Sequence, residues 1–131
     1  MSIEKLTKLF NPKVIAIVGA SAKKGSVGYS VMKNIVASGF DGIVYPINPI
    51  RTNVLGVKAY SSLEDVPDKI DLAIIVTPAR TVPEIVESCG IVGVASVLLI
   101  SAGFAEAGEE GKKLMKQIAE TIRRYKIRLL G

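Results

Sequence analysis

The sequence contains no histidine and no tryptophan, and it has a single cysteine, Cys89, and few aromatic residues. One cysteine excludes an internal disulfide and fits a reducing cytoplasm, where we expect this protein to reside. The lack of histidine excludes any mechanism that needs this residue within the chain, and no metal site is predicted. The few aromatic rings offer little material for stacking on bases, so no nucleic-acid partner is expected.

Long apolar runs are also missing. No run reaches the roughly 18 residues of a membrane span, and residues 1–5 lack the apolar core of a signal peptide, so no membrane partner is expected. Hydrophobic residues nevertheless make up 49% of the 131 positions, which is high for a chain of this length. Such a composition is typical of a single α/β domain, because its central strands are apolar on both faces.

Acidic residues are scarce in the first half of the chain. Residues 1–60 contain eight Lys or Arg against two Asp or Glu, whereas residues 61–131 contain nine against ten. The net charge of +5 is therefore concentrated in the first half. This distribution favours an anionic ligand there over a general affinity for nucleic acids.

The chain is organised around residues 14–28. Residues 14–18, Val-Ile-Ala-Ile-Val, predict a strand buried on both faces. The glycine-rich residues 19–28 follow, and apolar residues then recur at helical spacing. A strand, a glycine loop and a helix in this order present backbone N–H groups and the positive end of a helix dipole to a phosphate. The sequence therefore predicts a nucleotide-like ligand.

The glycine loop departs from two familiar nucleotide-binding patterns. The dinucleotide fingerprint requires Gly-x-Gly-x-x-Gly and an acidic residue about 20 positions on. Here the glycines stand at positions 19, 25 and 28, and Asn48-Pro49 occupies the place of the acid. A Walker loop has the form Gly-x-x-x-x-Gly-Lys-Ser/Thr, but five residues separate Gly19 from Gly25 and no lysine follows Gly25. Neither pattern is fulfilled.

The remaining sequence alternates between strands and helices with short connections. This alternation predicts a Rossmann-like, doubly wound parallel sheet in a single α/β domain, with its ligand at the carboxyl ends of the strands. The residues at the predicted strand ends are small or turn-forming, and none is an acid or a base. We therefore expect a site that holds a ligand and has no catalytic residue. Pro46 indicates an irregular or edge strand, and residues 81–84 resemble a capping box. We expect strands at 14–18, 43–47, 54–57, 71–76, 95–100 and from 127. We expect helices at 3–10, 27–38, 61–65, from 81 to about 88 or 92, and at 109–125.

Five segments at these strand ends carry a resemblance to a known family: residues 18–21 (Val-Gly-Ala-Ser), 25–28 (Gly-Ser-Val-Gly), 45–49 (Tyr-Pro-Ile-Asn-Pro), 75–78 (Ile-Val-Thr-Pro) and 99–104 (Leu-Ile-Ser-Ala-Gly-Phe). In their order and spacing they resemble the N-terminal CoA-binding domain of NDP-forming acyl-CoA synthetases. This group includes the α subunits of ADP-forming acetyl-CoA synthetase and of succinyl-CoA synthetase. The resemblance extends over essentially the whole chain.

The resemblance implies that the ligand is coenzyme A. Residues of the glycine loop would face its nucleotide and pyrophosphate, one proline would lie beside the adenosine, and later strand ends would line the route of the pantetheine arm. Independently of the family, Lys23, Lys24 and Arg51 are candidates for added charge near the phosphates, with solvated loop charges as the alternative for the two lysines. The implied cofactor-binding residues are Gly19, Ala20, Ser21, Ser26, Val27, Gly28, Pro49, Val76, Thr77, Pro78, Ser101, Ala102 and Gly103.

The absence of histidine acquires a meaning within this family. Its members pass phosphate through a histidine that is phosphorylated in the domain after this one. Since this chain has no histidine, we expect residues 1–131 to be the CoA-binding domain of a longer acid–thiol ligase, truncated and inactive alone. The resemblance also implies partners, namely the downstream synthetase domains and an ATP-grasp β subunit or domain.

Other interpretations stay open. A free-standing CoA-binding or regulatory protein would have the same residues without an attached ligase. A redox-sensing module that binds NAD(H) is a further alternative, disfavoured by the missing acid after the second strand. Cys89 is expected to be a small buried hydrophobe rather than a nucleophile. The basic residues within 123–128 are expected to be a favourable helix end, or else a contact with another domain or subunit.

Overall fold

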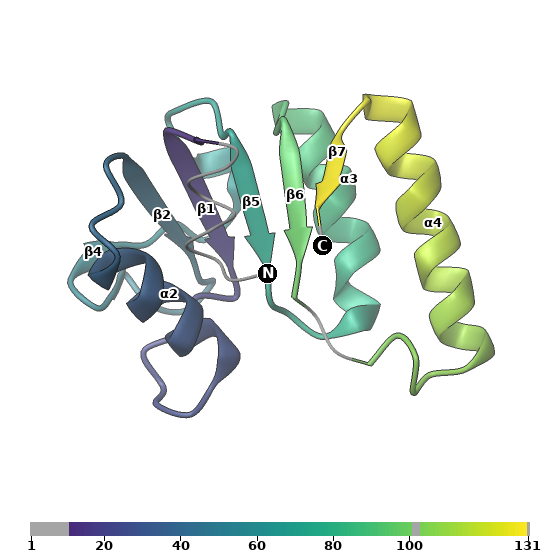
Figure 1. Cartoon of the computed structure of the whole chain (residues 1–131), viewed down its shortest axis with the longest axis horizontal. Coiled ribbons are helices and arrows are strands. Elements are labelled where there is room, and N and C mark those ends of the chain that lie inside the picture. The colour runs from purple at the N-terminus through teal and green to yellow at the C-terminus, as the bar shows by residue number, and fades with distance from the viewer. Residues whose placement is uncertain (1–10, 101–102, 131) are drawn as a thin grey trace.

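The computed structural model, which describes residues 11–100 and 103–130, contains a five-stranded parallel sheet with helices on both faces (Figure 1). The strand order is β2-β1-β5-β6-β7, and every neighbouring pair is parallel. The predicted Rossmann-like, doubly wound sheet is thereby confirmed. The strands are β1 (Val14–Val18), β2 (Ile43–Ile47), β5 (Leu72–Ile75), β6 (Ser96–Leu99) and β7 (Arg128–Leu130).

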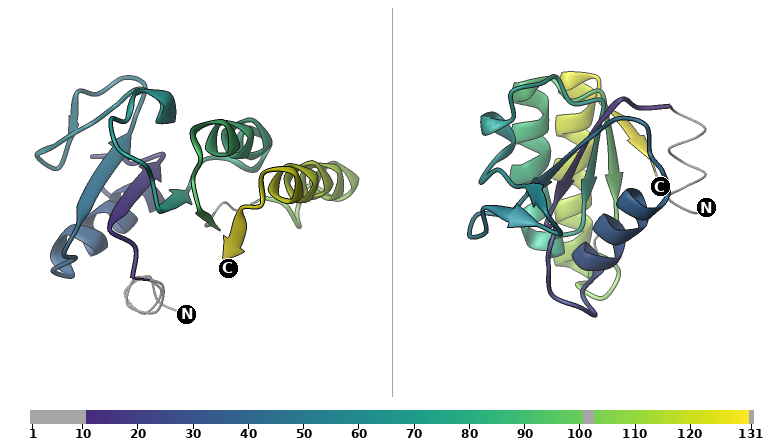
Figure 2. Two further views of the ribbon diagram at one scale, coloured as in Figure 1. Left: turned by 90° about the horizontal axis from the view of Figure 1, so that it is seen from above. Right: turned by 90° about the vertical axis from the view of Figure 1, so that its left-hand side faces the viewer.

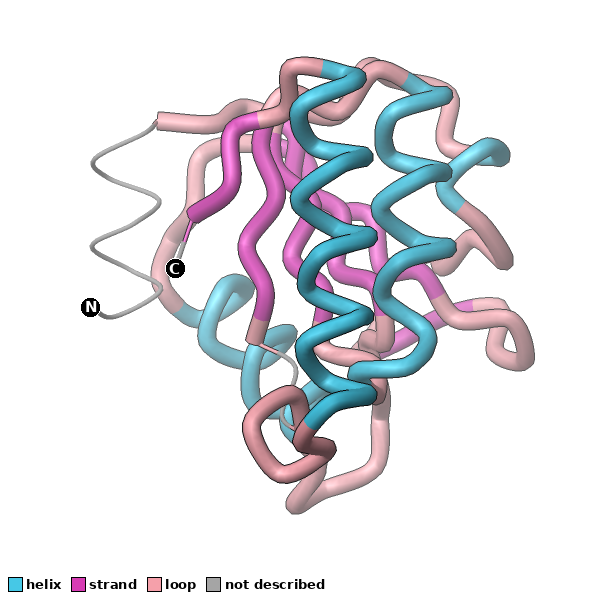
Figure 3. Tube along the Cα trace, turned by 90° about the vertical axis from the view of Figure 1, so that its right-hand side faces the viewer, coloured by secondary structure: helices cyan, strands magenta, loops and turns pink. Residues whose placement is uncertain are grey.

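Helices cover both faces of this sheet. One face carries α2 (Val27–Ala37), and the other carries α3 (Val82–Val92) and α4 (Glu109–Tyr125), which lie side by side (Figure 2, Figure 3). The expected helices over 27–38 and 109–125 are confirmed, and Gly39, with a φ of +74°, follows the first of them. No helix in the described ranges is long and apolar enough to cross a membrane.

The side chains of β1, an interior strand of the sheet, alternate between two apolar layers. In β1, Ile15 and Ile17 pack in the layer that contains α2, whereas Ala16 and Val18 pack in the layer that contains α3 and α4. Successive side chains of a strand point to opposite faces, so a strand covered on both sides must be apolar at every position. The unbroken apolar run of residues 14–18 is the sequence signal of this interior position.

The direction of the chain across the sheet reverses between β1 and β5. From β1 the chain moves outward to β2, and from β5 it moves the other way to β6 and β7. Strand pairing at this point is tight, because Ile15–Val18 of β1 pairs residue by residue with Leu72–Ile75 of β5. In open α/β sheets, ligands bind at the carboxyl ends of the strands where the order reverses.

Pro46 lies in an edge strand, as predicted, because β2 ends the sheet on that side. Proline cannot donate to a ladder, and an edge position spares it that requirement. The outer side of β2 is covered by the segment at Tyr60, whose N–H donates to the Pro46 carbonyl over 2.9 Å. The Tyr60 carbonyl in turn accepts from the N–H of Asn48, also over 2.9 Å. The carboxyl end of β2 is therefore held from outside as well as by β1.

The small strand expected at 54–57 is a hairpin instead. It consists of β3 (Asn53–Val54) and β4 (Val57–Lys58), which pair in antiparallel fashion. Between them, Leu55 and Gly56 have φ values of +50° and +81°. A two-residue turn with both residues at positive φ suits a hairpin. The sequence pattern missed it because leucine rarely occupies the left-handed region.

The capping box expected at Thr81 is also absent. A short 3-10 turn, η2 (Ala79–Thr81), precedes α3, so Thr81 already has helical φ and ψ angles of −86° and −15° and is not the extended residue that a cap requires. Its Oγ1 lies 2.7 Å from Oγ1 of Thr77 and 2.6 Å from the Pro78 carbonyl oxygen. The short helix expected at 61–65 is the 3-10 turn η1 (Leu63–Asp65). The helix predicted at 3–10 lies outside the described residues.

Candidate functional site

The carboxyl ends of the strands meet at one edge of the sheet, the lower edge in Figure 1. The N-termini of α2, α3 and α4 lie at the same edge, because each helix begins shortly after a strand ends. A helix N-terminus carries partial positive charge and unpaired N–H groups. This edge is therefore favourable for a negatively charged ligand, and most of the residues predicted from the sequence lie on it.

Gly19 is the first residue after β1, and the structure leaves no room for a side chain there. Its φ is +97°, and a Cβ atom would lie 2.8 Å from Cγ2 of Val76 and 3.0 Å from Cγ2 of Thr77. Gly28, in the first turn of α2, packs as closely, since its Cβ would overlap the Gly19 carbonyl. The glycine loop, the start of α2 and the end of β5 are thus brought into direct contact.

The serine hydroxyls of the glycine loop are used within the loop itself. Ser21 Oγ accepts from the N–H of Lys23 over 3.0 Å. Ser26 Oγ donates to the Lys23 carbonyl over 2.7 Å and accepts from the N–H of Tyr29 over 3.1 Å, which makes it the N-cap of α2. These contacts maintain the loop's shape.

The free hydrogen-bonding capacity of the loop is on its backbone. Within the described ranges, the N–H groups of Ala20, Ser21, Val27 and Gly28 have no acceptor. Backbone donors at the start of a helix are the groups that bind phosphate oxygens in nucleotide sites. The loop thus offers N–H groups to an anion, with the exposed Lys23 and Lys24 beside them.

Asn48 ties the end of β2 to the glycine loop. Its Nδ2 donates to the Ala20 carbonyl over 3.0 Å, and its Oδ1 accepts from the N–H groups of Ile50 and Arg51 over 2.9 and 3.0 Å. In the sequence, Asn48 stands at the position of the missing acidic residue, and this link was not predicted. The available signal was asparagine before proline, a pair that favours side-chain-closed turns. Pro49 is exposed beside it.

The ends of β5 and β6 complete the edge. Thr77 turns its methyl group toward Gly19, while its hydroxyl is paired with Thr81, and Pro78 is exposed. Gly103 follows β6 with a φ of +106°, and a Cβ there would lie 3.6 Å from Cβ of Ala79. The loops after β5 and β6 therefore adjoin each other. Of the predicted residues, Ser101 and Ala102 lie outside the described part of the chain.

In the described part of the chain, the side chains at this edge include no histidine, cysteine or cluster of carboxylates. Cys89 is fully buried within α3, and burial raises the pKa of its thiol to about 12, so it is a small buried hydrophobe as expected. Among the described residues, no group of three or more His, Cys, Asp or Glu could hold a metal ion. What the arrangement can do is bind an anion through backbone N–H groups at the start of a helix.

Comparison with known proteins gives a consistent result. Residues 13–131 match the model of the CoA binding domain family. The α subunit of acetate–CoA ligase [ADP-forming] I from Pyrococcus furiosus is 48% identical over 130 residues. The match covers 96% of this chain but 28% of that subunit. The chain thus spans less than a third of this curated relative.

Two solved structures show the same relation at two lengths. One is the apo form of a dinucleotide-forming acetyl-coenzyme A synthetase 1 from Candidatus Korarchaeum cryptofilum, which is 39% identical with a TM-score of 0.87. The match covers 96% of this chain and 27% of the synthetase chain. A hypothetical protein from Pyrococcus horikoshii is 28% identical with a TM-score of 0.66, and the match covers 93% of each chain. The same fold therefore occurs both within longer chains and as a protein of this size.

Proposed function

Because this chain belongs to the CoA-binding domain family, we propose that it binds coenzyme A at the carboxyl edge of its sheet. The observation that supports this most is the set of N–H groups at Ala20, Ser21, Val27 and Gly28 that have no acceptor within the described part of the chain. They lie where the positive end of α2 meets the reversal of the sheet. These groups would take the pyrophosphate. Lys23, Lys24 and Arg51 would add charge for the phosphates of the nucleotide.

The remaining predicted contacts follow from the shape of the ligand. Pro49 would lie beside the adenosine, at the end of β2. Ser26 would act by capping the helix that faces the pyrophosphate. The pantetheine arm is narrow and uncharged, and the small residues at the later strand ends would line its path. The residues proposed for this path are Val76, Thr77, Pro78, Ser101, Ala102 and Gly103.

We further propose that the chain is the CoA-binding part of an ADP-forming acyl-CoA synthetase. The 48% identity to an acetate–CoA ligase α subunit supports this assignment. The domain would hold the nucleotide end so that the thiol reaches an acyl phosphate made elsewhere, and such positioning alone accelerates a transfer step. Downstream synthetase domains and an ATP-grasp subunit or domain would supply the phosphorylated histidine and the ATP site.

A free-standing CoA-binding protein is the second candidate. It is favoured by one observation, the hypothetical protein from Pyrococcus horikoshii that matches this chain over 93% of both lengths. Both candidates bind CoA at the same site and differ in what that binding serves. An assay for acetyl-CoA formation from ATP, acetate and CoA addresses the chain itself: we expect no product from the 131 residues alone, and turnover would contradict the role as a binding part only.

Calorimetric titration with CoA, dephospho-CoA and NAD tests the binding proposal. We expect CoA to bind, and NAD binding without a response to CoA would overturn the assignment.

Gly28→Ala should lower the CoA affinity about tenfold or more, since its Cβ displaces the loop whose N–H groups meet charged oxygens. Gly39→Ala is the matched control, because this glycine lies at the other end of α2 and a Cβ there meets nothing within 4 Å. Its φ of +74° strains an alanine, so the variant should lose stability but keep the CoA affinity.

A further inference from the structure

One side chain, that of Asn48, connects the two loops on which the phosphate contacts of the proposed site depend. It bonds to the glycine loop through Nδ2 and to its own loop through Oδ1, and its backbone N–H is held by the Tyr60 carbonyl. Asn48 and Ala20 are 28 residues apart in the sequence. The bond between them is therefore a tertiary contact that joins the ends of β1 and β2.

The bond to Ala20 determines how the glycine loop presents its donors. The peptide unit is planar and trans, so the carbonyl of Ala20 and the N–H of Ser21 point in opposite directions. When Asn48 draws the Ala20 carbonyl toward β2, the Ser21 N–H is directed away from β2. This N–H has no acceptor in the described part of the chain. Asn48 thus sets the direction of a free donor that it does not touch.

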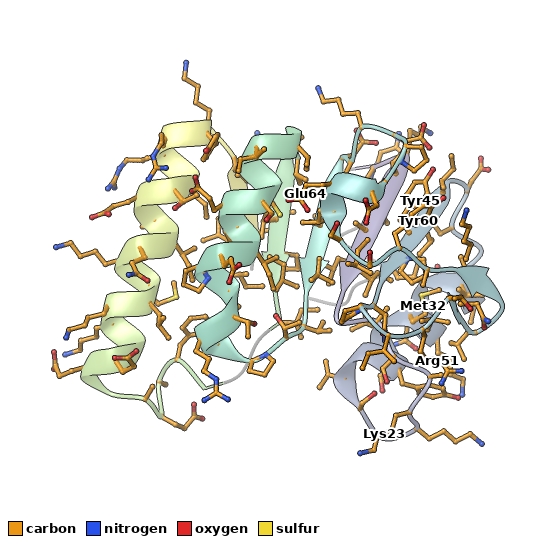
Figure 4. The ribbon with its side chains drawn as sticks, turned by 180° about the vertical axis from the view of Figure 1, so that it is seen from behind. Lys23, Met32, Tyr45, Arg51, Tyr60 and Glu64 are labelled. Carbon is orange, nitrogen blue, oxygen red and sulfur yellow. The ribbon has the colours of Figure 1, made fainter. Side chains whose placement is uncertain are left out.

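The carbonyl oxygen of the same side chain fixes the position of the Arg51 backbone. Oδ1 accepts from the Arg51 N–H, and the Arg51 Nε donates to the Asn53 carbonyl over 3.3 Å. Within the described residues, the two Nη groups of Arg51 have no acceptor, so the planar head is anchored at one nitrogen and open at the others. Figure 4 shows Arg51 and Lys23 toward the same end of the molecule.

We propose that Asn48 is a positioning residue that holds Arg51 and the glycine loop in place for separate phosphate groups of the ligand, and thereby makes the site selective for CoA over dephospho-CoA. This inference rests on the proposed function. In dinucleotide-binding sheets the end of the second strand lies beside the adenosine ribose, where an arginine accommodates a ribose phosphate. Coenzyme A differs from dephospho-CoA by such a phosphate. Asparagine suits the role because it donates and accepts at once, whereas an aspartate could not donate to Ala20.

The test is a double-mutant cycle read by calorimetry with CoA and dephospho-CoA. We expect Asn48→Ala to reduce the preference for CoA about tenfold, as removal of a charge-assisted contact does. Arg51→Ala should reduce the preference by a similar factor, and adding Asn48→Ala to it should change the preference no further. Asn34→Ala, an exposed asparagine of α2, is the matched control and should leave both affinities unchanged.

The possible outcomes separate this inference from the proposed function. Failure of the unmodified chain to bind CoA would overturn both. Binding of CoA with a preference that Asn48→Ala leaves intact, or an equal loss for both ligands, would overturn the positioning role alone. Thermal unfolding of each variant establishes that it is folded, and if Asn48→Ala is not, Asn48→Leu, which keeps a side chain of similar size but neither donor nor acceptor, takes its place under the same criteria.

Discussion

At the residue scale, two glycines of the same loop differ in the reason why a larger residue is unfavourable there. Gly19 has a φ of +97°, and a Cβ there would lie 2.8 Å from Cγ2 of Val76. Gly25 has a φ of +89°, but a Cβ there would meet nothing within 4 Å. Both positions strain an L residue, and only the first adds a steric conflict with β5. Alanine at the two positions therefore separates backbone strain from packing.

We expect Gly25→Ala to lower the free energy of unfolding by about 1–2 kcal/mol, the cost of a left-handed L residue. Gly19→Ala should lower it by a further 1–3 kcal/mol or so, because the added carbon forces β5 or the loop to shift. Chemical denaturation of both variants measures the difference. Equal losses would mean that the end of β1 and the end of β5 do not constrain each other.

The thiol of one residue, Cys89, makes the free energy of unfolding depend on pH in the alkaline range. In the folded state, burial raises the pKa of this thiol to about 12, and the negative charge of Glu64 contributes a smaller part of the increase. In the unfolded chain the thiol ionises near a pH of about 8.5. Below that pH the group is neutral in both states and stability does not depend on it. As the pH rises further, the unfolded state loses the proton first, so stability falls until the folded pKa is reached.

We therefore expect the free energy of unfolding to fall more steeply above pH ~9 in the unmodified chain than in Cys89→Ala. Denaturation at several pH values from about 7 to about 10 tests this, with the slopes compared rather than the absolute stabilities, because the variant also loses packing. Tyr45, whose pKa is raised to about 12 chiefly by its hydrogen bond to Asp68, contributes equally to both proteins. Parallel curves would contradict a buried neutral thiol.

At the element scale, α3 and α4 are joined by one cluster near the C-terminal end of α4. Tyr125 donates to Oε1 of Glu87 over 2.8 Å, and Arg124 Nη1 lies 3.3 Å from both oxygens of the same carboxylate. The ring of Tyr125 rests on Gly90, where a Cβ would overlap the ring atoms. The missing side chain of Gly90 thus sets how closely the two helices approach.

Gly90→Ala should destabilise the fold by about 1–3 kcal/mol, because α4 must move away from α3 or the ring must leave its place. The smaller, flexible side chain of Tyr125→Leu should recover part of this loss in the double variant, since the two residues are in contact. Thermal or chemical unfolding of the single and double variants provides the measurement. Additive losses would argue against direct packing between Gly90 and the ring.

At the scale of the whole molecule, the net positive charge lies on the part of the fold that contains the proposed phosphate contacts. The first 60 residues carry the net positive charge of the chain, with eight Lys or Arg against two Asp or Glu, and they include β1, α2 and β2, the part that contains the glycine loop and Arg51. A surface charge acts over about 10 Å at 0.1 M salt and about 3 Å at 1 M. Electrostatic attraction of a polyphosphate ligand to this part is therefore sensitive to ionic strength.

We expect the affinity for CoA to fall several-fold between about 0.1 and 1 M NaCl, and the affinity for dephospho-CoA to fall less, because it carries less charge. Replacing Lys23 and Lys24 by serine should flatten the salt dependence if these exposed lysines attract the ligand. Titrations at several salt concentrations decide the matter. A CoA affinity that does not depend on salt would assign the lysines to solvent.

Much of the fold was predictable because its signals are local. The apolar run at 14–18 requires burial on both faces, and the periodicity over 109–125 specifies one buried side of α4. Pro46 indicated an edge strand through a property of its own backbone. The segments carrying the family resemblance likewise stand at fixed places in the chain. In each case the physical requirement lies within a few neighbouring residues, so the sequence by itself determined it.

Only the tertiary structure decided which of these residues meet. The bond from Asn48 to Ala20, the contact of Gly19 with Val76 and the fit of Gly90 under Tyr125 each join residues far apart in the chain. These contacts depend on strand order and on the packing of whole helices, which no local pattern encodes. Leu55 and Thr81 illustrate the same limit, because the surrounding fold overrides the conformation that each residue would favour alone.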